Sequence, residues 1–507
     1  MLYLSKSKSK YTKLWQCPKM LWLMKNKPEE APPIDPSIQA RFDEGNEVGD
    51  FAMGLFGDFV EVTAFKDDGS GSLDLSKMIE LTKEEMEKGT ENICEASFSY
   101  NGLYCAVDVL RKEGAGWAIY EVKSSTHTDK AVYIADIAYQ KYVLENCGVK
   151  VTGTYIVTIN KEYIRGKKLD VTKLFNVTDV REPVEEEYPK VKQNIELAER
   201  VMASKKEPEK DVSAHCIDPY ECDFLGYCLG ELPEPSVFDL NGFGFTKALP
   251  YYQAGLVDFE SLRAGKVIKS DRQLLQIDHE LEERPSHIDK EGIKEFLDTL
   301  YYPLYFLDFE TMQLDIPAFE GTKPYQQIPF QYSLHYIETE RGEMKHKEFL
   351  GEPGKDPRRG IAEALVNDIP VDACVMAYNM GFEKGQIKTL ANVFPDLSSH
   401  LMKIHRNIVD LMVPFREGHY YNREMQGSYS IKHVLPALFP DDPELDYHNL
   451  EGVHNGGEAM SIYPQIQFME PEEAEKAKRN LLKYCELDTF AMVRIWQKLQ
   501  EVTADDK

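Results

Sequence analysis

Two groups of acidic residues in this chain have the types and spacing needed to hold divalent metal ions. The first group is Asp108 and Glu121, with Lys123 two residues after the glutamate. The second group lies beyond residue 300 and consists of Asp308, Glu310, Glu383, Tyr484 and Asp488. Carboxylates on adjacent strands bind hard cations such as Mg²⁺ or Mn²⁺, and these ions drive phosphodiester cleavage. The sequence therefore predicts two metal-dependent hydrolytic sites, each in its own domain.

The first group is expected on a β-hairpin. Residues 104–123 read as two strands joined by a turn at 111–116. Alternation along the second strand puts Glu121 and Lys123 on one face, and the hairpin can bring Asp108 beside them. The two carboxylates would hold an ion that lowers the pKa of a bound water. Lys123 would orient that water or stabilise charge on the phosphorus.

A helix from about Ala131 carries Gln140, which is expected to face the same site. This combination resembles the PD-(D/E)XK nuclease superfamily, in particular its RecB-like branch. The resemblance implies that the two acids bind metal, that Lys123 is catalytic and that Gln140 takes the place of that branch's glutamine. It also implies an upstream acidic ligand, for which Glu44 and Glu47 are candidates and Glu47 is preferred. A surface hairpin that carries these common residues by chance is the alternative.

Four cysteines are candidates for a cofactor site. Three lie within thirteen residues, at Cys216, Cys222 and Cys228. The fourth, Cys17, lies near the N-terminus, long before the hairpin. This split arrangement resembles the iron–sulfur RecB-like nucleases, in which four thiolates hold a 4Fe–4S cluster. The cluster would close a very long loop and act as a staple. Zinc is the alternative, although its sites favour C-x₂₋₄-C pairs.

The second group is expected at the ends of core elements. An apolar strand carries Asp308 and Glu310 on one face, where a metal pair would offset the cost of burying two carboxylates. Another apolar strand leads into a helix start that contains Glu383. Near the C-terminus, Tyr484 and Asp488 are four residues apart and share one helix face.

The order of these motifs resembles the tyrosine-bearing DEDD exonucleases of the DnaQ-like, ribonuclease H-like fold. The resemblance implies that the four carboxylates bind two Mg²⁺ ions and that Tyr484 orients the attacking water. Glu383 stands where aspartate is usual in that family. Asp410 also ends an apolar strand, either as an additional ligand or in a capping or surface role.

Length and composition set the organisation. A chain of 507 residues predicts about two to four domains. We expect an α/β protein with a restriction-endonuclease-like, RecB-like domain at 1–235, a helical connector at 236–300 and a ribonuclease H-like domain at 301–507. The whole chain resembles an uncharacterised prokaryotic family that fuses two such domains. The sequence lacks a long apolar run and a secretory signal, and its nine cysteines are an odd number, so a cytoplasmic location without membrane contact is expected.

The net charge of −27 argues against a general electrostatic grip on nucleic acid, so binding needs a local basic patch. The N-terminal lysines are one candidate, and a solvated flexible terminus is the alternative: Lys6, Lys8, Lys10, Lys13 and Lys19. The expected function is a metal-dependent nuclease with two sites that acts on DNA ends or single strands, with RNA possible. Its C-terminal site would be of the 3′–5′ exonuclease type. The other hypothesis is a nucleic-acid-binding or assembly module in which one or both sites are inactive, and protein partners are not indicated.

Overall fold

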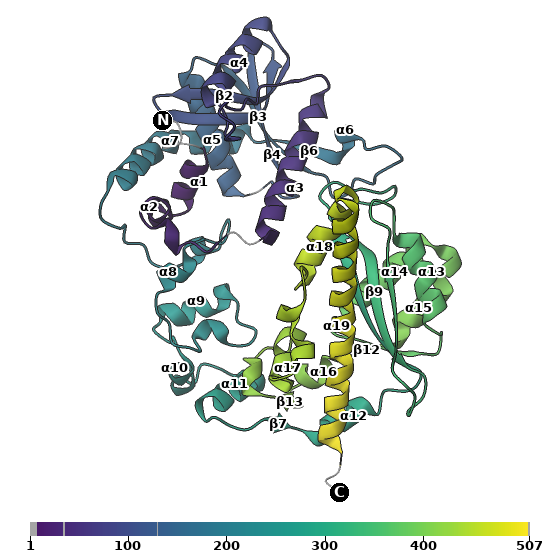
Figure 1. Cartoon of the computed structure of the whole chain (residues 1–507). Coiled ribbons are helices and arrows are strands. Elements are labelled where there is room, and N and C mark those ends of the chain that lie inside the picture. Colours follow the sequence, from purple (N-terminus) through teal and green to yellow (C-terminus); the bar gives the residue numbers. More distant parts are fainter. Residues whose placement is uncertain (1–7, 34–35, 129, 505–507) are drawn as a thin grey trace. The chain divides into compact units, whose positions relative to one another are not determined.

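Both halves of the chain combine helices with mixed β-sheets, which confirms the α/β class expected from the alternating strand and helix patterns (Figure 1). The computed structural model describes residues 8–33, 36–128 and 130–504. Among these residues, none of the helices has both the length and the apolar character needed to cross a membrane.

Two units can be distinguished along the chain. Unit 1 comprises Met1–Glu231 together with Leu314–Gln326, and unit 2 comprises Leu232–Gln313 and Gln327–Lys507. Residues 236–300, expected as a connector, therefore fall within unit 2. They are largely helical, as their composition predicts.

The sheet of unit 1 has six strands in the order β1-β2-β3-β4-β5-β6. Its strands are β1 (Val60–Glu61), β2 (Asn92–Tyr100), β3 (Leu103–Glu113), β4 (Gly116–Lys123), β5 (Val151–Ile159) and β6 (Phe175–Asp179). Strands β2, β3 and β4 are antiparallel, whereas β5 runs parallel to β4 because helix α5 (Ala131–Asn146) connects them. The predicted turn at 111–116 is too long. Only Gly114, with φ +58°, and Ala115 stand between the strands.

Helices pack on the faces of this sheet. The helices of unit 1 are α1 (Lys8–Gln16), α2 (Pro18–Asn26), α3 (Pro36–Met53), α4 (Leu75–Lys88), α5, α6 (Val171–Leu174), α7 (Arg181–Ala203) and α8 (Leu225–Leu229). One core cluster joins α5 to the sheet, to α7 and to Tyr11 of α1, whose ring stacks on Tyr139. A second cluster joins Val48 and Ala52 of α3 to strands β3 and β4. Helix α5 is therefore held between the sheet and α7, which fixes the direction of its polar residues.

Unit 2 has a five-stranded sheet in the order β10-β9-β8-β11-β12. Its strands are β8 (Leu304–Gln313), β9 (Gln327–Ile337), β10 (Lys345–Leu350), β11 (Cys374–Ala377) and β12 (Ile408–Asp410). Strands β8, β9 and β10 are antiparallel, and β11 and β12 run parallel to β8. A separate pair is formed by β7 (His287–Ile288) and β13 (Tyr420–Tyr421).

Alternation along β8 sends successive side chains to two different cores. Phe306 packs with Trp496 of the long helix α19 (Pro471–Thr503), whereas Leu307 packs with α13 (Arg358–Asp368), α14 (Gly381–Val393) and α15 (Pro395–Asn407) (Figure 1). The other helices of unit 2 are α9 (Phe245–Gln253), α10 (Phe259–Ala264), α11 (Asp271–Leu281), α12 (Lys290–Leu297), α16 (Val413–Arg416), α17 (Ile431–Leu438) and α18 (Gly456–Gln465). The acids of β8 share the face of Phe306 and are therefore directed to α19.

Candidate active sites

Three of the predicted acids in unit 2 converge. One carboxylate oxygen of each of Asp308, Glu310 and Asp488 lies within 4.8 Å of the other two. Asp308 and Glu310 come from β8, and Asp488 comes from α19, about 180 residues later in the chain. Because α19 covers this face of the sheet, acids that are distant in sequence become neighbours.

Burial and mutual repulsion make these carboxylates hard to ionise. Burial, followed by the nearby carboxylates of Asp488, Glu310 and Glu383, raises the pKa of Asp308 well above its usual value. Burial and Asp488 do the same for Glu310, and burial raises the pKa of Asp488 to about 6. A divalent cation would offset both effects, so this donor set fits Mg²⁺ or Mn²⁺.

Glu383 is the fourth predicted acid of this group. It lies in the first turn of α14 and is only 3% exposed, and its Oε2 atom has no hydrogen-bond partner. Burial, with a smaller contribution from Asp410, raises its pKa to about 8. Its charge also raises the pKa of Asp308, so it belongs to the same electrostatic cluster. A buried, unsatisfied carboxylate oxygen is consistent with a ligand position.

The raised pKa of Glu383 predicts a pH-dependent stability of the metal-free protein. Its pKa is about 8 when folded against an ordinary value of 4.5, so between these pH values the carboxyl ionises in the unfolded state while it stays protonated in the folded state, and the free energy of unfolding falls as the pH rises. In EDTA, Glu383→Gln is expected to raise Tm by about 2–4 °C at pH 8 and to change it little near pH 4.5. Thermal unfolding at both pH values measures this. The exposed Asp372→Asn serves as control, and equal shifts at both pH values would contradict the prediction.

Two tyrosines contact Asp488. The predicted Tyr484, one helical turn earlier on α19, is buried, and its hydroxyl lowers the pKa of Asp488. Tyr447, which the sequence did not indicate, donates its hydroxyl to Asp488 Oδ1 at 2.6 Å. It lies in a short 3₁₀ helix, η8 (Tyr447–Asn449), and no motif or spacing connects it to Asp488. Both hydroxyls favour the ionised carboxylate and so oppose the effect of burial.

A cleft of about 970 Å³ opens beside this cluster. Tyr447 lines the cleft and at the same time contacts Asp488. Lys432 also lines it and lowers the pKa of both Glu310 and Asp488 through its positive charge. Tyr447 is therefore the residue that joins the cleft to the acidic cluster. At Gly456, an added Cβ atom would lie 3.7 Å from Glu310 Oε2, so the start of α18 passes close to this carboxylate.

Asp410 has a structural role. Its Oδ1 atom accepts hydrogen bonds from the backbone N–H groups of Asn379 and Met412, and its Oδ2 atom accepts one from Arg416 at 2.9 Å. Asn379 has φ +65°, an unusual backbone conformation for a residue other than glycine, and this bond holds it there. Of the roles considered for Asp410, the contacts favour capping of the loop before α14.

In unit 1 the predicted hairpin residues also come together. The Val122 N–H donates to Asp108 Oδ2 at 2.7 Å, which places Asp108 beside Glu121. Lys123 Nζ lies 2.6 Å from Glu121 Oε1. Gln140 of α5 donates to the other oxygen of Glu121 at 2.6 Å. Lys123 and Gln140 therefore contact Glu121 directly, and Asp108 contacts the backbone of the residue that follows Glu121.

Asp136 is a further member that the sequence analysis did not include. It is buried, and its two oxygens accept hydrogen bonds from Lys123 at 3.0 Å and from Gln140 at 3.1 Å. It precedes Gln140 by four residues on α5, so both side chains project from one helix face. This spacing is the signal that could have identified it.

Glu47 is the upstream acid that the sequence analysis preferred. It is exposed on α3, and partial burial followed by the charges of Asp315 and Asp50 raises its pKa. Asp315 accepts a hydrogen bond from Ser124, the residue after Lys123, and burial raises its pKa too. Asp315 is thus the acid that connects Glu47 with the end of β4. The side chain of Glu44, the other candidate, lies outside the described residues.

The four predicted cysteines surround one small cavity of unit 1. Cys17, Cys216, Cys222 and Cys228 all line it, together with Lys19. Burial raises the pKa of Cys222 to about 11, and the other three thiols add to this effect. A tetrahedral zinc site requires sulfur atoms about 3.8 Å apart, given Zn–S bonds of about 2.3 Å. Among the described residues, these thiols do not form a group whose ligand atoms all lie within 4.8 Å of one another.

One family model matches part of the chain, mostly within unit 2. Residues 305–430 match the family model of a domain of unknown function, DUF2779. This match begins in β8 and includes Asp308, Glu310 and Glu383, but it ends before Tyr484 and Asp488. No curated protein matches the chain.

Two of the N-terminal lysines that are candidates for a basic patch form ion pairs with acids. Lys13 pairs with Asp223 at 3.7 Å, and Lys19 pairs with Glu207 at 2.9 Å. Lys6 and the side chain of Lys8 lie outside the described residues.

Proposed function

We propose that the protein is a divalent-metal-dependent nuclease with two hydrolytic sites, which acts on DNA ends or single strands. The observation that carries this proposal is the convergence of Asp308, Glu310 and Asp488 within 4.8 Å, with Glu383 and Tyr484 adjoining. Buried acids that repel one another are costly unless a cation offsets their charge. Such a cluster at the edge of a cleft is therefore a strong indication of a functional metal site.

The topology of each unit supports the same assignment. In unit 2, three antiparallel strands followed by two strands parallel to the first are the arrangement expected of a ribonuclease H-like domain. In unit 1, an antiparallel β2-β3-β4 meander, helix α5 and the parallel strand β5 are the arrangement expected of a PD-(D/E)XK domain. In both units the candidate acids lie on the strands that those folds use.

In unit 2 the side chains have separable roles in such a reaction. Bound Mg²⁺ or Mn²⁺ would activate water and stabilise charge on the phosphate. Asp308, Glu310, Glu383 and Asp488 would hold the ions. Tyr484 would orient the attacking water, and Tyr447 holds the Asp488 carboxylate in place. The cleft lined by Lys432 would take the terminal nucleotides, which gives a 3′–5′ exonuclease type of site.

In unit 1 the same chemistry would depend on Lys123. Asp108 and Glu121 would hold the ion, and Gln140 fixes the Glu121 carboxylate by donating a hydrogen bond to it. Lys123 now neutralises Glu121 and Asp136. When a cation takes over that neutralisation, the Lys123 ammonium becomes able to stabilise charge on the phosphate or to orient water.

The cysteine set would hold a 4Fe–4S cluster, because four thiolates suit such a cluster and the thiols surround one cavity. The cluster would tie α2 to the segment before α8 and so fasten the two ends of unit 1. A reducing cytoplasm suits a chain whose nine cysteines are all free.

Loss of a cysteine ligand is the test of this cofactor. Anaerobically purified wild-type protein is expected to contain about four irons per chain. Cys216→Ser should lose most of this iron and its visible absorbance, whereas Cys374→Ser, at a buried thiol of unit 2, should retain both. Stoichiometric zinc in place of iron would contradict the assignment.

Cleavage of labelled substrates tests the nuclease proposal. Wild type, Asp108→Ala, Asp308→Ala and the double variant are compared on 5′- and 3′-labelled single- and double-stranded DNA and on RNA, with Mg²⁺, Mn²⁺ or EDTA. Each single variant is expected to lose a different product pattern, and the double variant and EDTA should abolish all cleavage. Cleavage that persists in the double variant would refute the proposal.

The second candidate function is nucleic-acid binding without hydrolysis at one site. The ion pairs that already neutralise Glu121 and Asp136 favour this reading for unit 1, because they stabilise that site without a metal. If Asp308→Ala binds labelled DNA but releases no cleavage products, unit 1 binds nucleic acid without hydrolysing it.

A further inference from the structure

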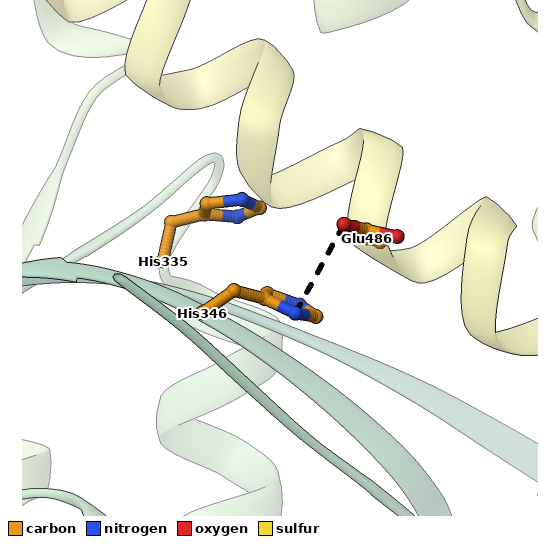
Figure 2. A group of neighbouring side chains, drawn as sticks. All are labelled: His335, His346 and Glu486. Atoms are coloured by element: carbon orange, nitrogen blue, oxygen red, sulfur yellow. Dashed lines mark ion pairs between the residues drawn. The ribbon is translucent and has the colours of Figure 1, made fainter. Parts of the chain in front are cut away.

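A third group of metal-ligating side chains lies in unit 2. One ligand atom of each of His335, His346 and Glu486 is within 4.8 Å of the other two (Figure 2). Two imidazoles and a carboxylate form a donor set typical of zinc and of other divalent transition metals. No step of the proposed nuclease reaction uses these residues.

Three secondary-structure elements position the group. His335 on β9 and His346 on β10 are directly paired across the two strands, so both side chains project from the same face. Their rings lie 4.6 Å apart between centroids. Helix α19 crosses this face and contributes Glu486, which points toward the two imidazoles in Figure 2. His346 Nδ1 and Glu486 Oε1 are 4.0 Å apart.

The distance of 4.0 Å between His346 Nδ1 and Glu486 Oε1 is too long for a hydrogen bond. Two ligands of one tetrahedral zinc ion, with bonds of about 2.0–2.2 Å each, lie about 3.4 Å apart. The imidazole and the carboxylate would therefore need to approach each other by only about 0.6 Å to share one ion.

A hydroxyl network fixes which nitrogen of each ring is available. His335 Nδ1 is 2.8 Å from Thr489 Oγ1, and His346 Nε2 is 2.9 Å from Ser333 Oγ. Ser333 Oγ is in turn 2.7 Å from Thr489 Oγ1, whose own hydrogen can go to the Glu486 carbonyl oxygen at 3.1 Å. One arrangement satisfies every member: each ring donates its N–H to a hydroxyl, Ser333 donates to Thr489, and Thr489 donates to the carbonyl. The lone pairs of His335 Nε2 and His346 Nδ1 then remain for a ligand.

Such an outer shell is what metal-binding histidines generally have, because a hydrogen bond to the second nitrogen sets the tautomer and the ring orientation. Ser333 and Thr489 are both completely buried, so their hydroxyl positions are fixed by packing. The group is therefore ordered before any ion arrives.

We propose that His335, His346 and Glu486 bind a divalent transition-metal ion of the zinc class. Its fourth position would be filled by water or by Glu348, which follows His346 by two residues on the same face of β10. The ion would fasten α19 to the β9–β10 edge of the sheet. Glu486 and Asp488 are two residues apart and therefore about 200° apart around the helix axis, so the ion would be separate from the acidic cluster. This proposal does not depend on nuclease activity.

The test counts zinc ions on the full-length protein. Zn²⁺ is titrated calorimetrically into EDTA-treated, dialysed protein in excess Mg²⁺, which occupies the acidic clusters. Wild type is expected to bind one more Zn²⁺ than His346→Ala or Glu486→Gln, or to bind that ion at least about 100-fold more tightly. Ser333→Ala, which removes only the hydroxyl that positions His346, should weaken the same ion by about 10–100-fold.

Matched controls separate this site from the others. Glu501→Gln, an exposed acid on the same helix, and His405→Ala on α15 should behave as wild type. All variants contain the four cysteines, so any zinc that these cysteines bind contributes equally to each variant. Co²⁺ in this site should give visible bands without thiolate charge-transfer absorption, and these bands should vanish in His346→Ala. Equal zinc binding by wild type, His346→Ala and Glu486→Gln, with unchanged circular dichroism, overturns the proposal.

Discussion

Asp488→Asn is expected to lower Mg²⁺-dependent cleavage at the unit 2 site by at least about 1,000-fold. Asp488 lies within 4.8 Å of both Asp308 and Glu310, so its oxygen completes the donor group. An amide has nearly the same shape but no charge, so the variant should keep the Tyr447 contact and lose affinity for the cation. Metal ions supply several kcal/mol to such reactions, and about 4 kcal/mol corresponds to about 1,000-fold.

Release of nucleotides from a 3′-labelled single strand, under single-turnover conditions across a range of Mg²⁺ concentrations, measures this loss in the Asp108→Ala background, in which cleavage by unit 1 is removed. Asp372→Asn, an exposed acid of the same unit, is the matched control and should retain full activity. In the same Asp108→Ala background, which lacks a metal ligand of unit 1, a Mg²⁺-induced rise in Tm should also disappear in Asp488→Asn. If the variant cleaves at the wild-type rate, Asp488 is not a ligand and the role given to this cluster is wrong.

The acidic cluster of unit 2 could be predicted because local geometry encodes most of it. Period-two alternation puts Asp308 and Glu310 on one face, and a four-residue interval puts Tyr484 and Asp488 on one helix face. These rules need no knowledge of the rest of the fold. The position of α19 over the acidic face of β8 depends on the topology of the whole unit. For this part of the site the sequence indicated only the order of the motifs.

Residues on irregular segments could not be predicted in the same way. Tyr447 lies in a 3₁₀ turn between longer elements, and Asp315 lies in the Leu314–Gln326 segment that belongs to unit 1. Neither has a periodicity that connects it to its partners, Asp488 and Ser124. Contacts of this kind depend on the path of a loop, which the pattern of apolar residues does not specify.

The histidine group shows a third case. His335 and His346 are directly opposite each other only because β9 and β10 pair in one register, and a shift by one residue would send one ring to the other face. Glu486 was within the sequence interval already assigned to the Tyr484 and Asp488 motif, but it projects from another side of the helix. The three residues therefore carried no shared signal before the register and the position of α19 were known.

Lys123→Met is expected to reduce cleavage at the unit 1 site by at least about 100-fold while it strengthens metal binding there. Lys123 neutralises Glu121 and Asp136, so its ammonium competes with a cation for the same carboxylates. Methionine fills similar space without charge, which removes this competition. The same change removes the group that would stabilise negative charge in the transition state, and loss of one such contact typically costs about 100–1,000-fold.

This opposite effect on binding and rate distinguishes catalysis from a purely structural ion pair. The measurement is made in the Asp308→Asn background, in which cleavage by unit 2 is removed. Lys112→Met, an exposed lysine on β3 of the same hairpin, should change neither the Mg²⁺ dependence nor the rate. If Lys123 served only to stabilise the fold, Lys123→Met would lower Tm at all Mg²⁺ concentrations and leave the rate of the folded fraction unchanged. A lower rate together with half-saturation at a lower Mg²⁺ concentration requires that Lys123 acts on the reacting phosphate.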